Sequence, residues 1–231
     1  GNFNEYYDNK SITEHLNTVK KLRGNVYGSL SIEEILIKLR ALDPERRITM
    51  FGLLAFSNST GLTKLTAPTV NIAVTQHAGS SKVNPSEISE VSLDDREFSG
   101  NAVDQFEGAL KFIYSKLPIR SRIETEGKRL NYLAIPQVAI RKTLANAIVH
   151  RDFTTFKGRI QIDIYADRIE FANPGRSLIP LYLIESAHPE TRNPLLMNYL
   201  RDRNIAEQRG RGIQTIKSSL REAGLAEPTF I

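Results

Sequence analysis

The sequence contains no cysteine, and it has only four histidines among 231 residues. Without cysteine, disulfide bonds, thiolate metal sites and a cysteine nucleophile are all excluded. The histidines are scattered and lack the paired spacing of metal ligands; they are His15, His77, His150 and His188. The longest apolar runs also fall far short of the roughly 20 residues that a membrane-spanning helix needs. We therefore expect neither thiolate chemistry nor insertion into a membrane.

The composition that remains is that of an ordinary globular protein, with 40% hydrophobic and 25% charged residues. A chain of this length buries roughly 70% of the surface that its unfolded form exposes, so a core can form without disulfides. The lack of cysteine fits a cytosolic protein, and we expect a cytoplasmic location without a secretory leader. The chain begins with Gly1 and stops at Phe230-Ile231. Both ends predict that it is a piece of a longer protein.

Charge is distributed unevenly along the chain. Residues 1–100 hold 11 Lys and Arg against 12 Asp and Glu, a net charge of −1. Residues 101–231 hold the other 20 against 14, a net charge of +6. A basic second half suits an anionic partner such as a nucleotide phosphate or a nucleic-acid backbone. The alternative is a charged surface that serves only solubility.

Local signals predict both helices and strands, without internal repeats. Ser31-Ile32-Glu33-Glu34 is a capping box that opens a short helix. Pro136 suits the first turn of a helix that reaches about Arg151, and Asn173-Pro174-Gly175 has the residue types of a type II turn. The remaining predictions are strands over 68–75, 91–98 and 130–135, a hairpin over 158–171, and helices after Asn101, Asn193 and Gly212. The apolar run 49–56 fits a helix or a strand.

The predicted helix over 136–151 carries an apolar stripe on one side and polar residues on the other. Lys142 and Asn146 lie opposite the stripe, where they are either solvated or available to a ligand. Downstream, Gly175 closes the hairpin and Gly210 and Gly212 precede a helix. Free amides at a helix N-terminus, with glycines that permit close approach, form an anion site. A Gly-x-Gly alone also occurs in ordinary loops.

The order of these segments along the chain is more informative than any one of them. The helix around Asn146 is followed by the hairpin, by Asn173-Pro174-Gly175, by Arg192-Asn193-Pro194 and by the segment 207–213. In this order they resemble a family of transcriptional regulators with a RecG-like, histidine-kinase-type ATPase domain, similar in fold to the GHKL superfamily. The resemblance covers about residues 31–231 and is strongest from Pro136 onward.

The resemblance implies an α+β protein in two parts. Residues 116–231 would form a GHKL-like α/β sandwich, a mixed sheet covered by helices, truncated at its C-terminus. Residues 1–115 would form a smaller N-terminal α+β extension. In such regulators an AlbA/Schlafen-type DNA-associated domain usually lies upstream, and a winged helix often lies downstream. DNA is thus an implied partner through modules outside this piece.

The resemblance also implies the ligands ATP and Mg²⁺ and the residues that hold them. Asn146 matches the asparagine that binds the Mg²⁺ bridging the nucleotide phosphates. Asn173 and Gly175 resemble a degenerate form of the turn that contacts adenine. Gly210 and Gly212 resemble the glycine pair at the end of the ATP lid, whose amides face phosphate.

Lys142 departs from the family pattern. It stands four residues before Asn146, where the superfamily has the glutamate that activates the attacking water. An ammonium group at neutral pH cannot accept a proton from water, although it can pair with a phosphate. We assign no catalytic residue and expect an ATP-binding module of a DNA-associated transcriptional regulator, with weak or no hydrolysis. The alternative is a ligand-free scaffold for homodimerisation or for protein or DNA contact.

The tripeptide His150-Arg151-Asp152 is a weaker candidate for acid–base chemistry. Two ends of a tripeptide near a helix terminus seldom meet properly. We expect His150 and Arg151 to cap the end of the helix and Asp152 to cap a turn.

Overall fold

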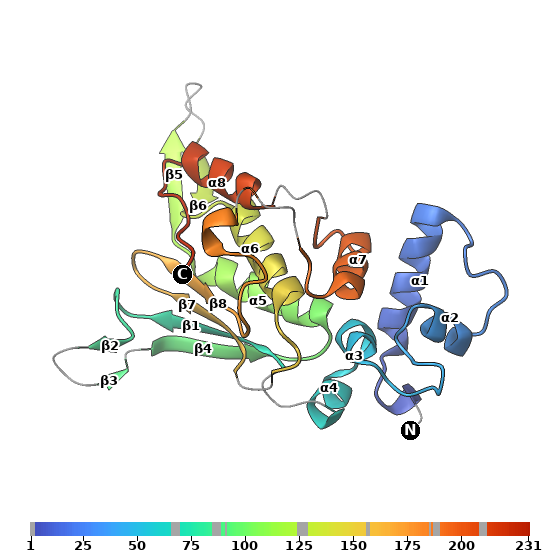
Figure 1. Ribbon diagram of the computed structural model, residues 1–231. Helices are drawn as coiled ribbons and strands as arrows, with labels where there is room; N and C mark the ends of the chain where they lie inside the picture. Colours follow the sequence, from blue (N-terminus) through green and yellow to red (C-terminus); the bar gives the residue numbers. More distant parts are fainter. Residues whose placement is uncertain are drawn as a thin grey trace.

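The computed structural model describes residues 3–65, 70–84, 89–90, 92–123, 129–155, 158–184, 186, 190–207 and 212–231. A helical N-terminal region lies beside a mixed sheet that is covered by further helices (Figure 1). The described parts therefore have the α+β architecture expected from the sequence.

Short helices make up the N-terminal region. They are η1 (Phe3–Glu5), α1 (Asn9–Arg23), α2 (Ile32–Lys38), α3 (Met50–Phe56) and α4 (Ser59–Leu65). The capping box of α2 is confirmed, since Ser31 accepts from the Glu34 amide and Glu34 accepts from the Ser31 amide. The apolar run 49–56 is a helix, because Thr49 caps it by accepting from the Gly52 amide at 3.0 Å.

The main sheet has four strands in the order β4-β1-β7-β8. These strands are β1 (Ile72–His77), β4 (Ser92–Phe98), β7 (Ile160–Ile164) and β8 (Ile169–Ala172). β1 pairs with β7 in parallel, and the two outer pairs are antiparallel. Two small hairpins are formed by β2 (Val83–Asn84) with β3 (Ser89–Glu90), and by β5 (Ile119–Ile123) with β6 (Arg129–Leu133).

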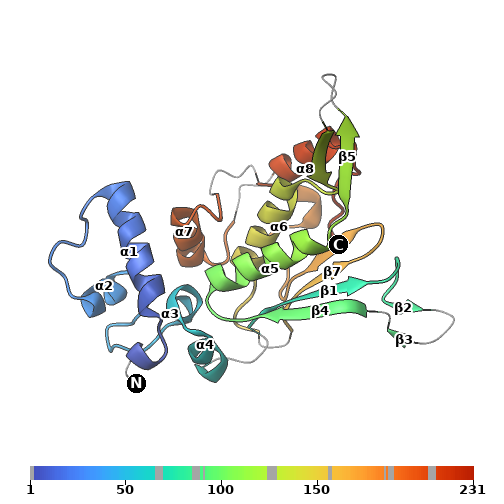
Figure 2. The same ribbon diagram turned by 180° about the vertical axis from the view of Figure 1, so that it is seen from behind.

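The second half of the chain supplies the remaining helices of the described residues. These elements are α5 (Ala102–Lys116), α6 (Gln137–His150), η2 (Leu181–Leu183), α7 (Pro194–Asp202) and α8 (Gly212–Glu222). α5 packs on β1 and β4, α6 on β8, and α8 on α6. α7 lies between α6 and the pair α1 and α3, as the view from behind shows (Figure 2). No helix in the described ranges is long and apolar enough to cross a membrane.

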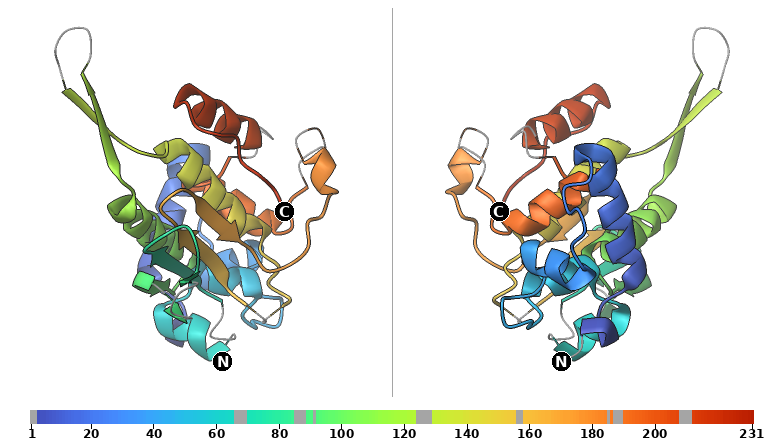
Figure 3. Two further views of the ribbon diagram at one scale, coloured as in Figure 1. Left: turned by 90° about the vertical axis from the view of Figure 1, so that its left-hand side faces the viewer. Right: turned by 90° about the vertical axis from the view of Figure 1, so that its right-hand side faces the viewer.

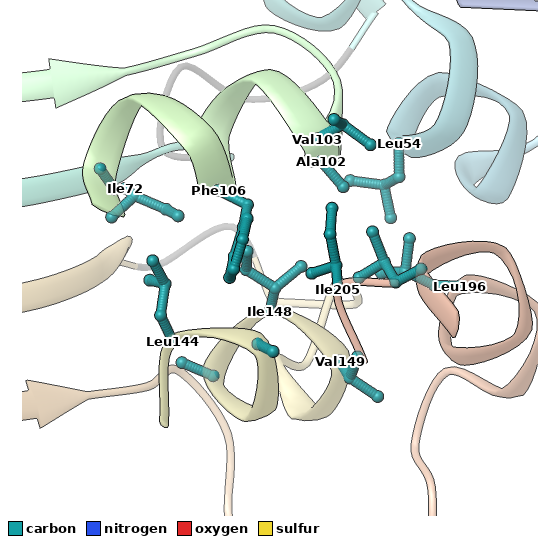
Figure 4. Close-up of a cluster of buried hydrophobic side chains, with 14 of the residues drawn as sticks. Leu54, Ile72, Ala102, Val103, Phe106, Leu144, Ile148, Val149, Leu196 and Ile205 are labelled. Atoms are coloured by element: carbon teal, nitrogen blue, oxygen red, sulfur yellow. The ribbon is translucent and has the colours of Figure 1, made fainter. Parts of the chain in front are cut away.

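One cluster of buried apolar side chains runs through the sheet and both sets of helices (Figure 4). Phe106 of α5 and Ile148 of α6 lie between Ile72 of β1 and Leu54 of α3, and all four are buried. The division expected at 115/116 falls within this unit, because β1 and β4 precede it and pair in one sheet with strands that follow it. We propose instead that residues 70–231 form the sheet-based part and residues 3–65 a helical layer on it.

His15 of α1 is a buried titratable group in this helical layer. Its ring is 4% exposed and lies 5.7 Å from the Phe56 ring and 5.1 Å from the Tyr199 ring. Burial disfavours the charged imidazolium and lowers the pKa of His15 from 6.5 to about 4; the charges of Asp202, Arg203 and Arg23 modify this effect.

This burial predicts a loss of stability in mild acid. The folded pKa lies below the unfolded one, so the unfolded chain binds the extra proton first as the pH falls from 6.5 towards 4. At about 1.4 kcal/mol per pKa unit, the free energy of unfolding should fall by about 2–3 kcal/mol across that window. Urea unfolding of the wild type and of His15→Gln should show a fall that is larger in the wild type by this amount, since other buried groups such as His150 contribute equally to both proteins. Equal pH slopes for the two proteins would contradict it.

Candidate functional site

The polar side of α6 faces α8, so it is not simply solvated. A Cβ built on Gly212, the first residue of α8, would lie 3.6 Å from Nδ2 and 3.9 Å from Oδ1 of Asn146. Asn146 is half-buried, and within the described part of the chain its carboxamide makes no hydrogen bond. Figure 3 shows α8 beside α6 from two directions. Asn146 and Gly212, far apart in sequence, are therefore neighbours.

The start of α8 offers backbone donors to this place. The first four N–H groups of a helix lack intrahelical partners and favour anions. Gly212 opens this helix of 11 residues. A Cβ added at Gly212 would be at ordinary van der Waals distance from Asn146, so the packing does not require glycine at this position. Gly210 lies outside the described residues.

The turn Asn173-Pro174-Gly175 is tied to the C-terminal end of α6. Nδ2 of Asn173 donates to the Ala147 carbonyl at 2.9 Å, and the Asp152 amide donates to the Pro174 carbonyl at 3.1 Å. Oδ1 of Asn173 is buried and has no partner within the described ranges. The turn is therefore attached to α6 at the residue that follows Asn146.

Gly175 has a packing reason to be glycine. Its φ of +105° fits the third position of the predicted type II turn. Residues other than glycine rarely adopt such a positive φ. A Cβ there would also lie 2.6 Å from the Cβ of Asp152. Gly175 thus allows the turn to pack closely on Asp152, just after the end of α6.

Lys142 is held by a residue that sequence reasoning missed. Its Nζ lies 2.8 Å from Oε1 of Glu207, and the exposed fractions of the two side chains are 15% and 67%. Glu207 belongs to the segment just before the glycine pair, but nothing local in the sequence signals a partner 65 positions earlier. Glu207 compensates the positive charge of Lys142. A phosphate at Lys142 would therefore have to compete with this carboxylate.

Asn193 precedes α7, as the sequence predicts, but its side chain does not cap this helix. Pro194 does open α7, but the Asn193 side chain makes no capping bond to it. Nδ2 of Asn193 instead donates to the carbonyls of Val149 at 2.7 Å and Arg151 at 2.8 Å. The last carbonyls of a helix have no intrahelical partner, and the Asn193 amide supplies a donor to this end of α6. Asn193 therefore anchors the chain before α7 to the end of α6.

Arg192 supplies another tie that the sequence did not indicate. Its Nη1 lies 3.3 Å from Oδ2 of Asp152, and its Nη2 donates to the Arg176 carbonyl at 2.6 Å. Arg192 also contributes to lowering the pKa of His150, for which burial is the larger cause. The neighbouring segments at the end of α6 are thus held together by side chains.

The tripeptide His150-Arg151-Asp152 performs only part of its expected role. Oδ1 of Asp152 accepts from the Thr154 amide at 2.9 Å, which confirms the turn cap. Arg151 is the C-cap residue of α6, as expected, but its side chain also has a structural role: it is 1% exposed and donates to the carbonyls of Asn71 at 3.3 Å and Gly158 at 3.0 Å. Because its side chain reaches the sheet, it is a structural link between α6 and the starts of β1 and β7.

Comparison with known proteins bears on the C-terminal third of the chain and on the fold. Residues 158–231 match a histidine-kinase-type ATPase family described as "Putative ATP-dependent DNA helicase recG C-terminal". No curated protein matches the chain. Among solved structures, the DIP2311 protein from Corynebacterium diphtheriae is similar, with a TM-score of 0.69 and 17% identity over 96% of this chain.

The structural likeness covers 42% of the DIP2311 chain, so this protein spans less than half of that one. At 17% identity the likeness concerns the fold alone. Residues 158–231 are therefore similar to a RecG-like C-terminal ATPase domain, and the chain as a whole shares its α+β fold with DIP2311.

Proposed function

We propose that this chain is the ATP-binding module of a DNA-associated transcriptional regulator and that it hydrolyses ATP weakly or not at all. The observation that carries the proposal is the close approach of the Asn146 carboxamide, which has no partner among the described residues, to the start of α8. The match of residues 158–231 to an ATPase family supports it. We propose Lys142, Asn146, Asn173, Gly175, Gly210 and Gly212 as the residues around the nucleotide.

The described residues at this place fit a nucleotide and its metal. The carboxamide oxygen of Asn146 is a hard oxygen ligand, of the kind that binds Mg²⁺ together with substrate phosphates. The N–H groups at the start of α8 suit phosphate oxygens. Oδ1 of Asn173, which is buried and has no partner in the described ranges, would accept from the exocyclic amine of adenine. Bound Mg²⁺ would supply positive charge against the phosphates.

No cluster of His, Asp or Glu that would hold a metal by itself occurs in the described ranges. Mg²⁺ would therefore depend on Asn146 together with the nucleotide phosphates, which is the usual mode for this ion. This predicts that nucleotide and metal bind together, and that either one alone binds weakly.

Binding should appear as thermal stabilisation. A ligand at 100 times its dissociation constant stabilises the folded state by about 2.7 kcal/mol. Asn146→Ala should lose most of the stabilisation by ATP with Mg²⁺, because it removes the proposed metal contact while changing a half-buried side chain only. The matched control is Asn17→Ala, the same change at an exposed position on α1. Differential scanning fluorimetry measures all three proteins.

Two outcomes would count against nucleotide binding: no shift at millimolar ATP and Mg²⁺, or an equal shift in Asn146→Ala. Absence of binding together with a concentration-dependent dimer would favour the scaffold alternative, which Asn173 also motivates because its amide group already caps α6.

Hydrolysis should be negligible in the wild type, since the residue at the water-activating position is an ammonium paired with Glu207. Lys142→Glu supplies a carboxylate but sets it against Glu207, so the double variant Lys142→Glu with Glu207→Lys is the better test. We expect the double variant to release phosphate from ATP faster than the wild type. Because Glu207 is largely exposed, the exchanged pair should change stability by at most about 1 kcal/mol. Wild-type turnover that Asn146→Ala abolishes would refute this inference.

The DNA-associated role rests on the net charge of +6 in residues 101–231 and on the domain that the resemblance implies upstream. If this chain contacts DNA phosphates itself, its affinity will fall steeply as salt is raised. Fluorescence anisotropy with a DNA duplex across a salt series measures that slope. A flat response would assign any DNA contact to other parts of the full protein.

A further inference from the structure

A surface cavity of about 210 Å³ lies in the N-terminal helical layer, away from α6 and α8. It is open to solvent, and residues of α1, the end of α2, α3 and α7 line it. The residues that matter here are His15, Tyr27, Lys38, Arg40, Phe51 and Tyr199. None of them belongs to the proposed nucleotide site. The volume is below the ~300–1,000 Å³ of pockets for drug-sized ligands, so an occupant must be small.

The charge of the cavity is positive. Arg23 is paired with Asp202, whose Oδ1 lies 2.6 Å from Nη2 of Arg23. Lys38 and Arg40 have no carboxylate partner within the part of the chain that the structure describes, and the Lys38 ammonium lies 5.9 Å from the centre of the Tyr27 ring. Because the Arg23–Asp202 pair is neutral and Lys38 and Arg40 each add a positive charge, the cavity favours the binding of an anion.

The walls of the cavity are aromatic. Phe51 and Tyr199 line it and meet edge to face, with ring centroids 6.2 Å apart. The His15 ring lies 5.1 Å from Tyr199, is 4% exposed, and carries a buried Nδ1 without a partner in the described ranges. Since burial lowers the pKa of His15 to about 4, the ring is neutral near pH 7. It therefore adds an unsatisfied polar atom and not another cation.

Arg40 occupies a backbone conformation that usually selects glycine. It follows the C-cap of α2 with φ +62°, and its amide donates to the Ile37 carbonyl at 2.8 Å. Glycine is the common residue at such a left-handed helix end because any Cβ is strained there. Replacing Arg40 by glycine should therefore remove the guanidinium from the cavity without a loss of stability.

We propose that this cavity binds a small aromatic anion, with its acid group at Lys38 and Arg40. The ring of the ligand would lie against Phe51 and Tyr199, where offset or edge-to-face packing is favourable. A guanidinium and an ammonium together bind either a carboxylate or a phosphate. The proposal does not depend on nucleotide binding, because the two places share no residue.

Calorimetry with four probes tests the proposal on the whole chain: benzoate, phenyl phosphate, inorganic phosphate and benzylammonium. We expect the two aromatic anions to bind in the millimolar range or tighter, inorganic phosphate to bind more weakly, and benzylammonium not to bind. Arg40→Gly should weaken binding by about tenfold, as expected for one charge-assisted contact. The same variant should unfold at an equal or higher temperature, since glycine relieves the strained backbone.

Arg46→Gly is the matched control, because Arg46 also has a positive φ, of +65°, but pairs with Glu33 and does not line the cavity. It should leave binding unchanged. Chemical shifts of the backbone amides of residues 38–41 should move with benzoate in the wild type. The proposal is overturned if neither aromatic anion binds, if benzylammonium binds as well as benzoate, or if Arg40→Gly binds as the wild type does.

Discussion

Gly52→Ala is expected to lower the free energy of unfolding by about 3–5 kcal/mol. Gly52 lies in α3, and a Cβ there would overlap both the Tyr7 hydroxyl and the Ala41 carbonyl. Those two groups form a buried hydrogen bond of 2.6 Å. The methyl group therefore overpacks the core, at a cost of about 1–3 kcal/mol, and breaks a buried polar contact, at about 1–3 kcal/mol more. Equilibrium unfolding in urea measures the sum.

Gly79→Ala is the control for this substitution, since a Cβ at Gly79 meets nothing within 4 Å. It should change stability by less than about 0.5 kcal/mol. Tyr7→Phe in the Gly52→Ala background should restore part of the loss, because it removes one of the two overlapping groups. A Gly52→Ala protein as stable as Gly79→Ala would mean that the contact between α3 and Tyr7 is not as close as the structure has it.

Arg151→Ala is expected to cost about 3–5 kcal/mol. Arg151 is the largest fully buried side chain among the described residues, and removing it leaves a cavity of the kind that costs about 2–5 kcal/mol for a long side chain. It also leaves the carbonyl of Gly158 without its donor, and that of Asn71 with one donor fewer. Burial lowers the pKa of Arg151 to about 10, so part of this loss is offset by relief of a buried charge.

Arg151→Met separates these contributions. Methionine refills most of the volume and also removes the charge, so we expect less than half of the loss seen in Arg151→Ala. Thermal or urea unfolding of both variants under one condition provides the comparison. If both variants were within about 0.5 kcal/mol of the wild type, Arg151 would not hold α6 to the sheet.

The elements that could be predicted from the sequence are those set by short-range chemistry. The Ser31 capping box and the Asn101 cap each involve a side chain and amides up to three residues away, so the local pattern contains both partners. α1 was not predicted from its sequence. Its buried face includes Ser11 and His15 as well as Ile12 and Val19, which hides the apolar period on which such a prediction depends.

The candidate site could be predicted only as separate pieces. The sequence indicated which side of α6 carries Lys142 and Asn146, and the structure puts that side against α8. The interaction partners of these side chains are brought together only by the tertiary fold. Glu207 pairs with Lys142, and Asn193 binds the end of α6. Such pairs join positions 42 to 65 residues apart, and neither partner leaves a signal in its own neighbourhood.

The parallel pairing of β1 with β7 has a consequence for synthesis on the ribosome. Ile72 is opposite Ile160, 88 positions later in the chain. At a translation rate of roughly 5–20 residues per second, β1 is synthesised several seconds before β7, its parallel partner. During that interval its hydrogen-bonding groups on that side are open to wrong partners. We expect the nascent chain to be most prone to aggregation, and most dependent on chaperones, when translation stops between residues 100 and 160.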